Sequence, residues 1–123
     1  MYVQSFRELI VWQKSIELVD EIYELVANLP QNENYGLKSQ MQRAAVSIPS
    51  NIAEGKKRGT KKDFIQFLRI ADGSAAELET QLIITKRRYK VESKKAESLL
   101  NEVEKMLNAM IRSLLSYKLP AKS

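Results

Sequence analysis

Residues 64–82 read FIQFLRIADGSAAELETQL and show the clearest periodicity in the chain. Apolar and small side chains recur there at spacings of three and four, which places them along one face of an α-helix. Proline is absent from the stretch, and its single glycine does not interrupt the pattern. The stretch therefore predicts a long amphipathic helix whose core-facing residues are Phe64, Phe67, Leu68, Ala71, Ala75, Leu78 and Leu82.

Helix signals continue on both sides of this stretch. Thr60, with Asp63 three residues later, predicts the start of this helix, which we expect to end near Tyr89. Breaks at residues 29–32, 55–60 and 91–93 separate it from three more helices, expected at about 7–29, 34–57 and from 93 to before Pro120. Short connections between long helices favour antiparallel neighbours, so the predicted fold is an all-α, up-down-up-down four-helix bundle. We expect one domain over residues 1–118 and a frayed tail over 119–123.

The second and fourth helices carry matching core stripes. Pro49 lies inside the second helix, where it removes one backbone hydrogen bond. Because the apolar phase continues from Ile48 to Ile52, we expect a kink at Pro49 and not a break. The two stripes consist of Leu37, Met41, Ala44, Ala45, Ile48 and Ile52, and of Ala96, Leu99, Leu100, Val103, Leu107, Met110 and Leu114.

Composition excludes several functional classes. The 123 residues contain no cysteine and no histidine, which removes disulfides, thiolate metal sites and the commonest general base. No nucleotide-binding glycine loop or nucleophile elbow is present, and di-metal bundle sites require histidines. We therefore expect no enzyme activity, no cofactor and no metal. Since no apolar run is long enough to cross a bilayer and the N-terminus is unlike a signal peptide, we expect a cytoplasmic protein without a membrane partner.

Two helices are more apolar than a single bundle requires. The first has one stripe at Trp12, Ile16, Val19, Tyr23 and Val26 and another at Val11, Leu18, Ile22, Leu25 and Leu29. Opposite its core stripe, the third helix has Ile70, Gly73, Ala76, Thr80 and Ile84. Scattered apolar residues are normal on a surface, but two phased stripes favour self-association.

A polar row accompanies the core stripe of the second helix. Short amides and hydroxyls predominate in it, which suits a semi-buried interface better than a solvated flank. We expect a buried Arg43 there to need a carboxylate, with Glu77, Glu79 and Gln81 as candidate partners, or with Glu54 in a structural ion pair. The row consists of Gln40, Arg43, Ser47, Asn51 and Glu54.

Three stretches carry a family resemblance: LIVWQK at 9–14, YGLKSQMQRAAVSIPSNIAEG at 35–55 and FLRIADGSAAELETQL at 67–82. The chain resembles the four-helix-bundle proteins of the 23S ribosomal RNA intervening-sequence family, and SIPSNIAEG at 47–55 is the most specific part of the match. The resemblance implies a homopentameric ring. It also implies kinship with the accessory variability protein of diversity-generating retroelements, whose partners are a reverse transcriptase and its RNA. The family motif falls here on Gln40, Arg43, Ala44, Ser47, Pro49, Asn51, Glu54, Gly55, Gly73, Ser74, Glu77, Glu79 and Gln81.

Charge is distributed unevenly. Residues 1–36 have a balance of −4, whereas residues 37–62 have a balance of +6, most of it in GKKRGTKK at 55–62. Lys61 and Lys62 should oppose the dipole of the helix that they begin, whereas Lys86, Arg87, Arg88 and Lys90 should complement the dipole of the helix that they end. A basic segment that works against helix stability is the better candidate for function. We expect Gly55 and Gly59 to let this loop follow a phosphate backbone.

Two functions remain open on the residues alone. One is a homo-oligomeric adaptor that contacts RNA or DNA phosphates, without reading bases, through Lys56, Lys57, Arg58, Lys61 and Lys62. The other is a purely structural or protein-binding module with no nucleic-acid role.

Overall fold

A computed structural model, described here for residues 5–116, shows an all-α chain with four long helices. They are α1 (Ile10–Val26), α2 (Leu37–Arg58), α3 (Lys61–Tyr89) and α4 (Lys94–Ser116), with 3-10 turns η1 (Phe6–Glu8) and η2 (Gln31–Glu33) before α1 and α2. The four-helix bundle is confirmed. The expected frayed tail, 119–123, lies outside the described residues.

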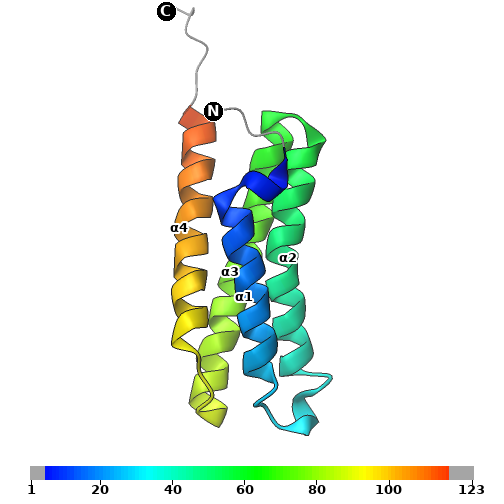
Figure 1. Ribbon diagram of the computed structural model, residues 1–123, viewed down its shortest axis with the longest axis vertical. Coiled ribbons are helices and arrows are strands. Elements are labelled where there is room, and N and C mark those ends of the chain that lie inside the picture. The colour runs from blue at the N-terminus through cyan, green and yellow to red at the C-terminus, as the bar shows by residue number, and fades with distance from the viewer. Residues whose placement is uncertain (1–4, 117–123) are drawn as a thin grey trace, which may run out of the picture.

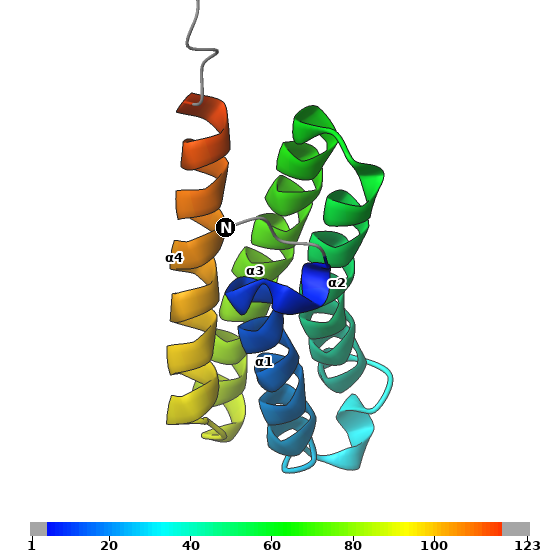
Figure 2. The same ribbon diagram turned by 45° about the horizontal axis from the view of Figure 1, so that its top comes forward.

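The four helices surround a single core. Each helix packs against two others, α1 against α2 and α4, and α3 against α2 and α4. The colour gradient in Figure 1 runs down α1, up α2, down α3 and up α4, so consecutive helices alternate in direction. Figure 2 shows the α2–α3 connection and the C-terminal end of α4 at the same end of the bundle.

Local sequence explains most helix boundaries. The Thr60 hydroxyl accepts the Asp63 amide at 3.1 Å, as predicted for the start of α3, and the Ser93 hydroxyl accepts the Ala96 amide at the start of α4. Lys90 ends α3 in the left-handed conformation, with φ of 58°. The prediction that a helix runs without interruption through Pro49 is confirmed, while the kink remains a prediction.

Three predicted boundaries were wrong by about a turn, one of them the end of the first helix, which lies at Val26 and not Leu29. The first helix begins at Ile10 and not Arg7, because Ser5 caps a separate turn over Phe6–Glu8. The second begins at Leu37 and not Asn34. There, a Glu33 carboxylate oxygen accepts the Leu37 amide at 3.0 Å, and the Tyr89 hydroxyl donates to the other oxygen of the same carboxylate. The sequence showed no sign of this link between the α1–α2 connection and the end of α3, because the two residues are 56 positions apart.

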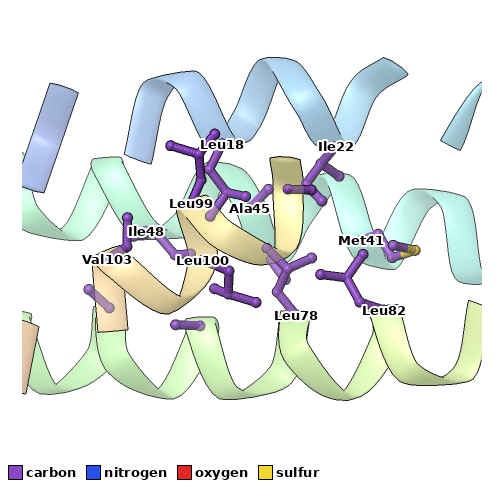
Figure 3. Packing of buried hydrophobic residues seen from close by; sticks show 14 of the residues in the cluster. Leu18, Ile22, Met41, Ala45, Ile48, Leu78, Leu82, Leu99, Leu100 and Val103 are labelled. Carbon is purple, nitrogen blue, oxygen red and sulfur yellow. The ribbon is translucent and has the colours of Figure 1, made fainter. Parts of the chain in front are cut away.

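Core composition follows the predicted stripes closely. All of the predicted core residues of α2 and α4 are buried except Leu37, Met110 and Leu114, which are half-buried. Of the predicted core residues of α3, Phe64 and Phe67 are half-buried and the other five are buried. Figure 3 shows Leu18 and Ile22 of α1 beside core residues of the other three helices. In α1, therefore, the stripe containing Val11, Leu18 and Ile22 forms the core. The other stripe is divided: Val26 is buried in the core, Trp12 and Val19 are half-buried against it, and Ile16 and Tyr23 are exposed.

Candidate nucleic-acid interface

The basic segment lies on a tight helical hairpin. Lys56, Lys57 and Arg58 form the last turn of α2, Lys61 and Lys62 the first turn of α3, and only Gly59 and Thr60 lie between them. Gly59 has φ of 88°, which glycine adopts without strain. We call these five cations the basic tip; Lys57, Arg58, Lys61 and Lys62 are exposed and Lys56 is half-buried.

The prediction of a flexible basic loop was wrong. Gly55 is buried within α2, and a Cβ built on it would lie 2.6 Å from the Phe67 Cβ. Gly55 therefore allows α2 and α3 to approach closely and gives the segment no freedom to follow a phosphate backbone. The hairpin presents its cations from a rigid support.

Aromatic rings support two of the cations. The Lys56 amine lies 5.9 Å from the centre of the Phe64 ring, and the Arg58 guanidinium lies 4.9 Å from that of Phe67. Arg58 also donates to Glu54 at 2.9 Å. Lys57 and Lys62 have no ion-pair partner within residues 5–116, so their charge is the most available to an anion.

Three lysines at the opposite end of the bundle are engaged with carboxylates, whereas Arg87, Arg88 and Lys90 have no ion pair within residues 5–116. The Lys86 amine lies 3.2 Å and the Lys94 amine 3.9 Å from the same Glu92 oxygen, and the Lys95 amine lies 3.3 Å from a Glu21 oxygen. The hydrogen bond to Glu92 raises the pKa of Lys86. These pairs at the opposite end of the bundle reduce the local positive potential, which makes the basic tip the stronger candidate.

Three residues of the polar row, Gln40, Arg43 and Ser47, line a groove between α2 and α3. The Ser47 and Ser74 hydroxyls hydrogen-bond across it at 2.8 Å, and the Asn51 amide donates to the Ser47 hydroxyl at 2.9 Å. The hollow has a volume of about 440 Å³, and we call it the polar groove. It is lined by Tyr35, Ser39, Gln40, Arg43, Ala44, Ser47, Ser74 and Glu77.

Arg43 differs from its prediction in two ways. It is exposed, and Glu54 is paired with Arg58, not with Arg43. Of its three predicted partners in α3, only Glu77 lines the same groove. Gln81 is buried with its carbonyl oxygen unsatisfied by any described residue, and Glu79 faces α4. Glu77, Glu79 and Gln81 lie within about one turn of α3 but on different faces of it. Composition alone could not show which of them faces Arg43.

Glu79 meets another carboxylate between α3 and α4. A pocket of about 230 Å³ is lined by both Glu79 and Glu104. Burial, followed by the hydrogen bond to Glu79 and repulsion from Glu79 and Asp72, raises the pKa of Glu104 to about 7. Within residues 5–116 no group of three or more carboxylates is arranged to hold a metal ion. Glu104 was not singled out from the sequence, where it is one acid among many on α4.

The predicted apolar surplus is present on the surface. Ile70 and Ile84 of α3 are 45% and 39% exposed, and a Cβ built on Gly73 would meet nothing within 4 Å. On α1, Ile16 and Tyr23 are 37% and 48% exposed. Tyr35, at the end of the polar groove, is 98% exposed, and the sequence analysis did not single it out. No described helix is both long and apolar enough to span a membrane.

Comparisons with known proteins identify relatives of this arrangement. A family model described as the 23S rRNA-intervening sequence protein matches residues 7–112. A crystal structure of a protein of unknown function from the S23 ribosomal protein family of Bacteroides thetaiotaomicron is similar, with 29% sequence identity and a TM-score of 0.71. The match covers 84% of this chain and 99% of that one. No curated protein sequence matches the chain.

Proposed function

The chain belongs to the 23S rRNA-intervening sequence protein family, and from that premise we propose that it is a non-enzymatic, homo-oligomeric adaptor that contacts RNA phosphates through the basic tip. The family resemblance implies a pentamer for the assembly. Each copy would contribute one rigid tip. The reverse transcriptase partner implied by the resemblance would then be one protein bound by such an adaptor.

One observation carries the nucleic-acid proposal: the difference in charge pairing between two lysines of the basic tip and three lysines at the opposite end of the bundle. Lys57 and Lys62 are exposed without ion-pair partners in the described chain, whereas Lys86, Lys94 and Lys95 face carboxylates. An unpaired cation loses little interaction free energy when a phosphate replaces its hydration, whereas a paired cation must first break its ion pair with a carboxylate. If the assembly gathers several tips on one side, their potentials add.

The chemistry of the tip favours phosphate contacts over base recognition. Phe64 and Phe67 are half-buried beneath Lys56 and Arg58, so their rings are not free platforms for base stacking. The positive end of the α3 dipole lies beside Lys61 and Lys62 and adds to the attraction for an anion. We therefore expect binding that varies little with RNA sequence.

The test compares two matched double variants in their affinity for a structured RNA hairpin over a series of salt concentrations. The double variant Lys57→Gln with Lys62→Gln should weaken binding. It should also make the slope of log affinity against log salt less steep by about 1.4 to 1.8, because each phosphate contact contributes roughly 0.7 to 0.9 to that slope. Lys86→Gln with Lys94→Gln removes the same charge from the opposite end and should change the slope much less. If the two variants have equal slopes, or the parent does not bind RNA, the proposal is wrong.

The alternative, a protein-binding module, is favoured by the polar groove and by Tyr35 at its end. Tyrosine is enriched at interfaces because it offers large contact area at low entropic cost. Failure of the RNA experiment would move this alternative ahead.

A further inference from the structure

Two exposed faces of the subunit are unlike each other in charge. The α1 face consists of exposed Ile16, Asp20 and Tyr23 with half-buried Trp12 and Val19, and Glu17 and Glu24 border it. The α3 face consists of exposed Ile70, Gly73, Ala76, Thr80 and Ile84. Both faces have apolar centres, so covering either one with a partner carries little desolvation cost.

The charges around the two faces are complementary. Glu17, Asp20 and Glu24 are exposed and have no ion-pair partner in the described chain, which gives the α1 face a balance of −3. Arg43, Arg69 and Arg87, all exposed, surround the α3 face, and Glu77 is the acid among them, which gives a balance of +2.

We infer that assembly is head-to-tail, with the α1 face of one copy packed on the α3 face of the next. This inference rests on the proposed homo-oligomer and specifies its contact. An α1–α1 contact between two copies would bring six carboxylates together without cations, and like charges across an interface are strongly unfavourable. The alternating contact instead pairs carboxylates with arginines. Gly73 and Ala76 give the α3 face a low surface on which the Tyr23 ring can pack closely.

The placement of the faces is consistent with a closed assembly. Lys14 and Glu21 of α1 pair with Glu102 and Lys95 of α4, so the α1 face lies on the opposite side, toward α2. On α3, Asp72 accepts a hydrogen bond from Asn108 of α4, whereas Ser74 meets Ser47 of α2. Ile70 and Glu77 lie on the Ser74 side by helical phase, so the α3 face also leans toward α2. Head-to-tail contacts between two faces inclined to the same side turn each copy in the same sense, which permits a ring.

The test uses one variant for each face. Tyr23→Arg places a cation where the arginines of the α3 face should dock, and Ile84→Asp places an anion where the acids of the α1 face should dock. Each variant alone should be monomeric by light scattering. An equimolar mixture should associate, because the intact α3 face of one variant can pack on the intact α1 face of the other. Ile83→Asp is the matched control, because Ile83 is more exposed than Ile84, at 53%, but lies toward α4, and it should assemble like the parent.

The outcomes separate two failures. If the parent itself is monomeric, the proposed assembly is wrong. If the parent assembles but the mixture stays monomeric, or either variant assembles alone, the head-to-tail contact is wrong. Circular dichroism should show unchanged helicity in each variant, and Ile16→Arg with Ile70→Asp provides a second pair, on other exposed positions, should either first variant unfold.

Discussion

Replacing Gly55 with alanine should destabilise the bundle, although alanine is normally the better helix residue. Gly55 lies inside α2, where the exchange by itself would gain about 1 kcal/mol from helix propensity. The new methyl group, however, would lie 2.6 Å from the Phe67 Cβ and 3.2 Å from a Phe64 ring carbon. The closer atom is attached directly to the α3 backbone and cannot rotate away, so α2 and α3 must separate at the tip.

The two effects have opposite signs, and their sizes decide the result. Overpacking that displaces the backbone costs about 1 to 3 kcal/mol, and a contact this short places Gly55→Ala toward the upper end. After subtraction of the propensity gain, we expect a net loss of about 1 to 2 kcal/mol in the free energy of unfolding. For a domain of this size, that corresponds to a decrease in Tm of very roughly 4 to 12 °C.

Gly73→Ala is the matched control. Gly73 also lies in a helix, but a Cβ there meets nothing within 4 Å, so the propensity gain of about 1 kcal/mol should appear unopposed. Both exchanges are best measured by urea unfolding in the Ile84→Asp background, so that assembly does not contribute to stability. A Gly55→Ala protein as stable as its parent would refute the close approach of α2 and α3 at the tip.

Two further predictions concern ionisation. Because the pKa of Glu104 is raised to about 7 in the folded state, the folded protein binds more protons than the unfolded one between about pH 4.5 and 7, so stability should fall as pH rises through this window. Glu104→Gln should remove most of that decrease, measured by urea unfolding at pH 5 and pH 8. An unchanged decrease would contradict the pairing with Glu79. The Tyr89 hydrogen bond lowers the pKa of Glu33, so this carboxylate stabilises the fold above its ordinary pKa of 4.5, and the effect is lost as pH falls through the lowered value. Tyr89→Phe should therefore raise the Glu33 pKa measured by NMR and lower stability at pH 7, while an unaltered Glu33 titration would show that the hydroxyl does not hold it.

The fold could be predicted in detail because its determinants are local and repetitive. The spacing of Leu68, Ala71, Ala75 and Leu78 identifies a buried face without reference to any other helix. Boundaries set by neighbouring side chains, such as Thr60 with Asp63, were equally readable. The start of α2 was not, because Glu33 is held by Tyr89 from a distant part of the chain.

The candidate site was less predictable, since its properties depend on which charges meet. The tip residues were identified from composition, but their rigidity follows from the contact of Gly55 with Phe67, which no sequence period reveals. Similarly, Arg43 was expected to be buried and paired because its neighbours are short and polar. The hydroxyls of Ser47 and Ser74 instead satisfy each other, and Arg43 is left exposed beside them.

Charge pairing is the property that connects the two proposals. Lys86 and Lys95 lie close to Glu92 and Glu21, whereas the acids of the α1 face have no ion-pair partner in the described chain. In a monomer, Glu17, Asp20 and Glu24 are exposed and unpaired around an apolar centre. A contact that buried them without cations would remove their hydration without compensation. A second copy supplies Arg43, Arg69 and Arg87 at the matching face. Lys57 and Lys62 belong to neither face and stay available in the assembly, where a phosphate backbone is a suitable polyanion for them.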